Sequence, residues 1–126
     1  MRAALAALAF FTQLAHADAS RIVTLALPHA LRTGDTAWLE VKVGIIARGE
    51  EIEIATAAGR FLGVISPHGI HSGHEAGTYT IPLPADAIAD DHISLRISLD
   101  RSGHAQRAPT TEEVKSIRVT IVDAAR

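Results

Sequence analysis

The chain contains no cysteine, which excludes disulfides, thiolate metal ligands and cysteine nucleophiles. Its one methionine is Met1, so the rest of the sequence also lacks thioether ligands. Iron–sulfur clusters and copper(I) sites depend on such sulfur ligands, and the sequence therefore excludes both. Without covalent cross-links, the fold that we expect must be stabilised by its hydrophobic core alone.

Aromatic residues are also scarce, at 4% of the 126 residues. Carbohydrate modules and proteins that bind single-stranded nucleic acid usually stack their ligands on several aromatic rings, so this scarcity argues against both classes. A strong charge of one sign is absent as well, because the formal net charge is only −2. Binding of nucleic acid needs a basic surface, and we expect no nucleic-acid partner.

The uncharged apolar run at residues 3–11 is too short to span a bilayer, and we expect no membrane span. Arg2 precedes this run, and small-x-small patterns that end at Ala17 and Ala19 follow it. Such a combination is typical of a secretory signal peptide. We therefore predict a signal peptide over residues 1–19, cleaved after Ala17 or Ala19, a mature domain over residues 20–126, and a periplasmic or secreted protein.

The predicted mature region is dominated by alternation of apolar and polar residues, the period of a half-buried β-strand. The pattern is clearest at residues 36–45, where the inward set is Ala37, Leu39, Val41, Val43 and Ile45. It recurs at residues 92–99 and 117–121, and in weaker form at residues 22–27, 51–56 and 78–83. Residues 61–65 are apolar on both faces, which predicts a central or covered strand.

These segments predict an all-β fold, an antiparallel β-sandwich of the immunoglobulin-like kind with about seven strands. No stretch is long enough for the crossover helices that a parallel sheet needs, and a small β-barrel is the alternative. The short link at residues 57–60 predicts a hairpin. We expect one helical turn within residues 86–91 and a single capped turn at Thr110-x-x-Glu113.

One segment carries a candidate metal site. His68, His71 and His74 form a His-x-x-His-x-x-His pattern, and Glu75 follows directly. Imidazole and carboxylate groups bind zinc, copper(II) or nickel, and the intervening glycines would let a loop turn these side chains toward one point. The alternatives are a solvated loop with incidental histidines, or a cluster of imidazoles that repel one another on acidification. No other cofactor is expected.

Trp38 falls on the polar side of its strand, which would place a tryptophan on the outer face of the fold. Tryptophan is enriched at protein interfaces, so Trp38 is a candidate partner surface. The alternative is that a neighbouring loop covers it or that a bulge changes the register. Asp90, Asp91 and His92 place two carboxylates beside an imidazole, but aspartates before a strand are also ordinary turn residues.

Motifs for catalysis are absent, because the sequence has neither a Gly-x-Ser-x-Gly elbow nor a Ser-x-x-Lys pair. We therefore expect a non-enzymatic binding or accessory module whose partner is another envelope protein. Divalent-metal binding by the loop from His68 to His74 is the alternative function.

Overall fold

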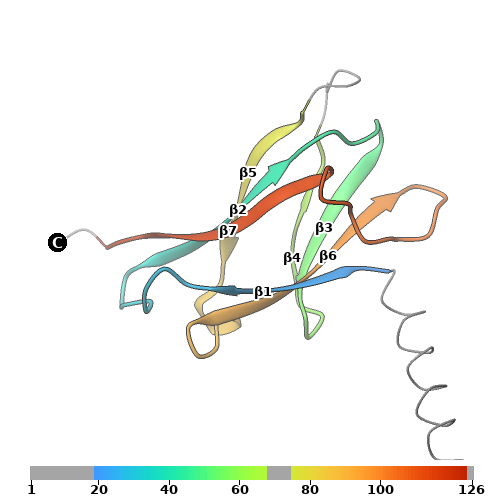
Figure 1. Cartoon of the computed structure of the whole chain (residues 1–126). Helices are drawn as coiled ribbons and strands as arrows, with labels where there is room; N and C mark the ends of the chain where they lie inside the picture. The colour runs from blue at the N-terminus through green and yellow to red at the C-terminus, as the bar shows by residue number, and fades with distance from the viewer. Residues whose placement is uncertain (1–18, 68–74, 125–126) are drawn as a thin grey trace, which may run out of the picture.

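The chain forms two antiparallel β-sheets, as the computed structural model shows for residues 19–67 and 75–124, the residues that the structure describes (Figure 1). The strands are β1 (Arg21–Ala26), β2 (Thr36–Val43), β3 (Glu50–Thr56), β4 (Phe61–Ile65), β5 (Gly77–Leu83), β6 (His92–Arg101) and β7 (Val114–Val122). One sheet has four strands in the order β1-β6-β3-β4, and the other has three in the order β5-β2-β7. The predicted antiparallel sandwich is confirmed, with two separate sheets in place of a single closed one.

The core lies between the sheets because the strands turn their apolar residues inward. Burial alternates along β2 and β3, as the sequence pattern predicts. The largest fully buried side chains are Leu39, Val41 and Val43 of β2, Ile52 and Ile54 of β3, Ile93, Leu95, Ile97 and Leu99 of β6, and Val114 of β7. Full burial of one such side chain stabilises a fold by about 1.5–3 kcal/mol, so β2, β3 and β6 dominate the core.

The inward pattern of β2 ends earlier than predicted. The strand stops at Val43, where a bulge shifts its register against β7. Gly44 then donates its N–H to the carbonyl of Glu113 (2.9 Å), and a side chain at Gly44 would collide with the backbone of the turn before β7. Ile45 therefore turns outward, contrary to the prediction, and Ile46 is buried in the core instead.

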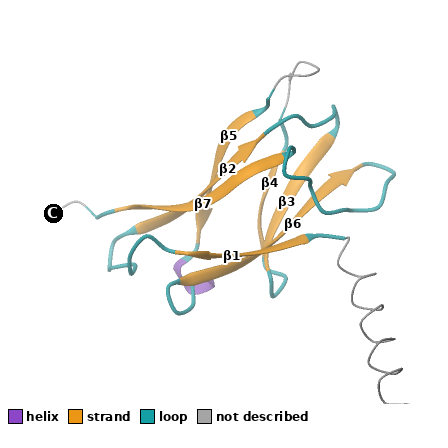
Figure 2. Ribbon diagram, viewed as in Figure 1, coloured by secondary structure: helices purple, strands orange, loops and turns teal. Residues whose placement is uncertain are grey.

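The connections follow the predicted turn chemistry. Residues 57–60 join β3 to β4 in an antiparallel hairpin. The one helical element among the described residues is the 3-10 turn η1 (Ala85–Ala87), drawn in purple in Figure 2. Before β7, Thr110 Oγ1 accepts the N–H of Glu113 (3.2 Å) and Glu113 Oε1 accepts the N–H of Thr110 (2.8 Å). The hairpin and the capped turn are confirmed, and η1 overlaps the segment in which a helical turn was expected.

The sandwich keeps only part of the immunoglobulin arrangement. In constant immunoglobulin domains the first, second, fourth and fifth strands form one sheet, and the third, sixth and seventh form the other. Here β2 and β5 share one sheet and β3 and β6 share the other, as in that arrangement, whereas β1, β4 and β7 have each changed sheet. The exchange places β4 at the edge of the four-stranded sheet, which determines what that sheet exposes.

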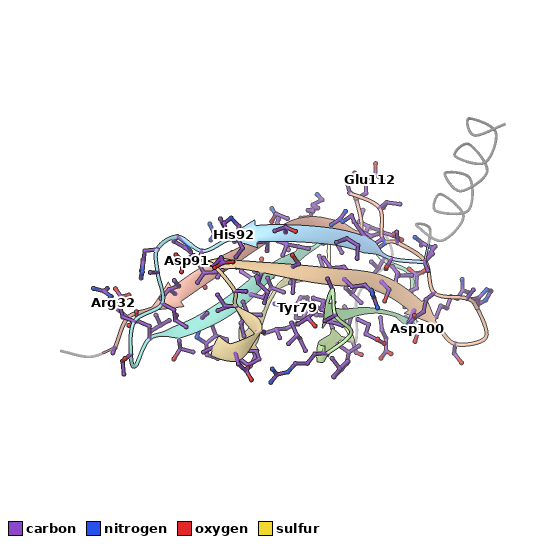
Figure 3. The ribbon with its side chains drawn as sticks, turned by 90° about the horizontal axis from the view of Figure 1, so that it is seen from below. Arg32, Tyr79, Asp91, His92, Asp100 and Glu112 are labelled. Atoms are coloured by element: carbon purple, nitrogen blue, oxygen red, sulfur yellow. The ribbon has the colours of Figure 1, made fainter. Side chains whose placement is uncertain are left out.

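The sandwich has two distinct ends. The start of β1 and the connection from β6 to β7 lie at one end, and the β1–β2 loop and the end of β7 lie at the other (Figure 1). Figure 3 shows the same separation from below, with Asp100 toward the first end and Arg32 at the second. In the described part of the chain, no helix is long and apolar enough to cross a membrane.

Candidate functional site

The candidate site lies on the outer face of the four-stranded sheet. The strand register aligns one outward residue from each strand in a single row: Ile22 of β1, Arg96 of β6, Ala55 of β3 and Phe61 of β4. Ile22 is 56% exposed and Phe61 is 60% exposed. We call these four residues the outer row. The outer row places an exposed guanidinium between two large apolar side chains.

Strand β4 is an edge strand, which corrects the prediction that residues 61–65 form a central or covered strand. On its outer side Val64 is 48% exposed beside the exposed Phe61. On its inner side Ile65 is buried, and Gly63 packs so closely on Ile81 of β5 that an added Cβ would lie 3.3 Å from it. The prediction was wrong because an apolar pattern on both faces does not reveal where a strand lies in the sheet.

A hollow of about 830 Å³ opens over the same face. Its floor is formed by outward residues of β3 and β6, and its walls come from the start of β1, the β3–β4 turn and the β6–β7 connection. The lining residues are Ala19, Ser20, Arg21, Ile22, Glu53, Ala55, Gly59, Arg96, Ser98, Gln106 and Ala108. We call it the outer hollow. It joins segments from three distant parts of the sequence, so no local motif could have indicated it.

The β6–β7 connection covers one side of the outer hollow. Arg107 and Leu99 exchange two backbone hydrogen bonds (2.7 and 3.2 Å), so the connection returns alongside the end of β6. Gln106 donates from its Nε2 to Glu53 Oε2 (3.5 Å) on the outer face of β3. Ser98 is consequently only 6% exposed, although its neighbours place it on the outer side of β6.

Two charged side chains line the outer hollow, the guanidinium group of Arg96 and the carboxylate of Glu53. Arg96 donates from Nη2 to the carbonyl of Ala57 (3.0 Å) and forms no ion pair among the described residues. Arg21 borders the hollow at the start of β1, but the register pairs it with the buried Ile97, so its side chain starts from the inner face of the sheet. Its Nε is buried without a hydrogen-bond partner among the described residues. Arg96 is therefore a positive charge on the outer face without a carboxylate partner.

The β6–β7 connection is held in place by an ion pair between Arg107 and Glu113. Arg107 donates from Nη1 and Nη2 to the two carboxylate oxygens of Glu113 (2.8 and 2.7 Å), and its Nη2 lies 3.7 Å from Glu50. The hydrogen bond to Glu113 raises the pKa of Arg107. The hydrogen bond from Arg107 lowers the pKa of Glu113, against the effect of its partial burial. This bidentate pair fixes the connection at the position where it walls the hollow.

A different charged cluster fastens the opposite end of the sandwich. The side chain of Asp35 is fully buried and accepts the N–H groups of Arg32 (3.0 Å) and Ala124 (2.9 Å). His29 Nε2 and Arg32 Nη2 lie 3.4 and 3.7 Å from Asp123 Oδ1. His29, Asp35 and Asp123 thus offer metal-ligand atoms within 4.8 Å of one another. Arg32 already brings a positive charge to both carboxylates, and the cluster links the β1–β2 loop to the end of β7.

The predicted metal site falls mostly outside the described residues. His68, His71 and His74 all lie there, so their predicted role stays a prediction. Glu75 is described: it is exposed, and its carboxylate pairs with the ammonium group of Lys115. A hydrogen bond from Lys115 and its positive charge lower the pKa of Glu75.

Trp38 lies on the outer face of the three-stranded sheet, near the start of its central strand β2. The register places it between Pro82 of β5 and Thr120 of β7, and its side chain is half-buried. The shift in the β2 register occurs only at the far end of the strand, so no bulge precedes Trp38. Its role as a partner surface stays a prediction.

The remaining candidates, Asp90, Asp91 and His92, lie in the turn before β6. Asp90 and Asp91 have φ angles of 54° and 60° and form the two central residues of a tight turn, closed by hydrogen bonds between Ala89 and His92 (2.9 and 3.0 Å). His92 Nδ1 lies 2.8 Å from the Asp90 carbonyl. These residues therefore serve as turn residues in the described structure.

The fold and the site define a small all-β sandwich with a charged hollow on one outer face. Comparison of the chain with protein-family models, with curated proteins and with solved structures gave no match.

Proposed function

We propose that the chain is an exported, non-catalytic binding module, that its partner is another envelope protein, and that this partner docks on the outer face of the four-stranded sheet. Export rests on the signal-peptide pattern of residues 1–19, and the docking face rests on the side chains that the four-stranded sheet exposes.

The observation that carries the proposal is the exposed apolar side of β4. Phe61 and Val64 point outward from an edge strand, and Ile22 is exposed on the opposite edge of the same sheet. Isolated exposed apolar residues are ordinary, but Ile22 lines the outer hollow, and Phe61 and Val64 pair in the register with Ala55 and Glu53, which also line it. A surface with apolar anchors around polar groups is typical of protein interfaces.

An extended segment of the partner fits the dimensions of this face. Neighbouring strands are about 4.8 Å apart, so the outer row from Ile22 to Phe61 spans roughly 14 Å across the sheet. An extended chain rises about 3.3 Å per residue, and four or five partner residues would cover that distance. The outer hollow, with apolar side chains at both edges of the sheet, offers room for such a segment.

The test is affinity co-purification from the native envelope fraction with matched variants of the full chain. The double variant Phe61→Ser/Val64→Ser should lose the partner that wild type retains, because it removes both apolar anchors of β4. Val122→Ser is the control, since Val122 is as exposed as Phe61 but belongs to the other sheet. Equal retention by all three proteins would contradict the proposed face.

Repeating the co-purification in the presence of a chelator distinguishes direct docking from divalent-metal binding, the alternative function. Divalent-metal binding by His68, His71 and His74 would be favoured by two results together. Wild type would lose the partner only when chelator is present, and the His71→Ala variant would lose it without chelator. Retention that is independent of chelator would favour direct docking.

A further inference from the structure

We propose that the outer hollow recognises a carboxylate on the docked partner segment, with Arg96 as the group that binds it; this inference rests on the proposed function. It names the chemistry of the partner segment, an acidic side chain flanked by apolar ones, which the exposed face of β4 alone does not specify.

The guanidinium group of Arg96 carries the first step of the argument. Arg96 is exposed in the outer row, and its one side-chain hydrogen bond to a described residue goes to a backbone carbonyl. Guanidinium groups match carboxylates well because their N–H donors form parallel pairs of hydrogen bonds.

The neighbours of Arg96 decide between a peptide carboxylate and a phosphate polyanion. Glu53 lies in the same hollow and would repel a chain of several negative charges, whereas a single carboxylate can avoid it. Ile22 and Phe61 flank Arg96 in the outer row and offer apolar contacts that a peptide can use. The hollow thus favours one negative charge on an otherwise apolar segment.

The register gives the spacing of that segment. Arg96 lies one strand from Ile22 and two strands from Phe61, which correspond to about 5 Å and about 10 Å. In an extended segment the carboxylate would therefore stand one or two residues from the apolar side chain that contacts Ile22. About three residues would separate it from the apolar side chain that contacts Phe61.

The direct test uses two blocked peptides with this spacing, identical except for glutamate or glutamine at the acidic position. The full chain, labelled with nitrogen-15, is titrated while the Nε–Hε signal of Arg96 is followed by NMR. We expect the glutamate peptide to bind about tenfold more tightly than the glutamine peptide, and the preference to shrink as salt is raised. Equal affinities, or no shift of the Arg96 signal at about 1 mM peptide, would overturn the inference.

Three variants of the chain sharpen the test. Arg96→Gln should abolish the preference for glutamate, and Glu53→Gln should increase it because a repelling carboxylate is removed. Arg118→Gln is the matched control, because Arg118 is an exposed arginine of β7 that pairs with Glu40 away from the hollow. An equal effect of Arg96→Gln and Arg118→Gln would show a general charge effect and would overturn the inference.

Co-purification distinguishes this inference from the proposed function. If Arg96→Glu retains the partner at the wild-type level while Phe61→Ser/Val64→Ser loses it, the docking face stands and carboxylate recognition is wrong. If both variants retain the partner, the proposed face is wrong, and the inference that rests on it fails too. Loss of the partner by both supports the two together.

Discussion

Asp35 is the residue on which the far end of the sandwich depends most. Its buried carboxylate accepts one backbone N–H from its own loop and another from Ala124, 89 positions further along the chain. A charged acceptor strengthens such bonds, and loss of the acceptor leaves buried N–H groups without a partner. Asp123, in the same cluster, is exposed and has looser contacts with His29 and Arg32.

Replacement of Asp35 by alanine should therefore lower the free energy of unfolding by about 2–4 kcal/mol, since two charge-assisted hydrogen bonds are lost. Asp123→Ala is the control and should change it by about 0.5 kcal/mol or less, as expected for an exposed ion pair. Urea denaturation of both variants measures the difference. Similar values for the two changes would show that the buried carboxylate has no special role.

Leu95 and Arg96 test the inward and outward assignment of β6 at neighbouring positions. Leu95 is fully buried and Arg96 is exposed, as the alternation in the sequence predicts. Leu95→Asp should unfold the domain because it buries an unpaired charge, whereas Arg96→Asp should change stability by about 0.5 kcal/mol or less. Chemical denaturation compares them, and equal tolerance would contradict the register.

At the scale of elements, turns and connections determine how the strands are placed. The turn before β6 uses two consecutive aspartates at positive φ, and the connection before β7 uses a capped turn together with the pair of Arg107 and Glu113. The first is a locally strained turn, because residues other than glycine at positive φ carry a cost. The second depends on ionisation, because its main bonds need a charged carboxylate.

Position 91 offers a test of the turn. Asp91→Gly should raise the free energy of unfolding by about 0.5–1 kcal/mol, because an Asp-Gly pair suits a turn with positive φ at both central residues. Asp91→Ala should lower it by about 1 kcal/mol, since alanine lacks the tolerance of aspartate for this conformation. Thermal unfolding of the two variants shows directly whether each change raises or lowers the stability. A decrease for glycine would show that the turn has another geometry.

The pair of Arg107 and Glu113 predicts a defined pH dependence. The pKa of Glu113 is lower in the folded chain than its ordinary value of 4.5, so the pair stabilises the fold fully above that value. This contribution is lost as the pH falls through the lowered pKa of the folded state. Glu113→Gln should therefore reduce stability at pH 7 and flatten its decline below about pH 4.5. An unchanged acid profile in denaturation experiments would show that the pair contributes nothing.

For the whole molecule, the sequence predicted the layers better than the surface. Alternation at Leu39 and Val41 defines an inner face in any sandwich, because burial follows directly from side-chain direction. Strand order depends on contacts between distant segments, and nothing local to Phe61 shows that β4 lies at an edge. The outer hollow depends on that order, since Ile22, Arg96 and Gln106 meet only after folding. The doubly apolar pattern of β4 is the one signal in the sequence that bears on this surface, because it predicts apolar side chains on both faces of the strand.

The central claim is that another protein docks on the outer face of the four-stranded sheet. Site-specific photo-crosslinking in the native envelope tests it most directly, with benzoylphenylalanine in place of Phe61 or Val64, and with the equally exposed Val122 of the other sheet as the control position. The account predicts one discrete adduct with a different protein from positions 61 and 64, and none from position 122. Adducts only from position 122, adducts only with a second copy of this chain, or none at all would contradict it.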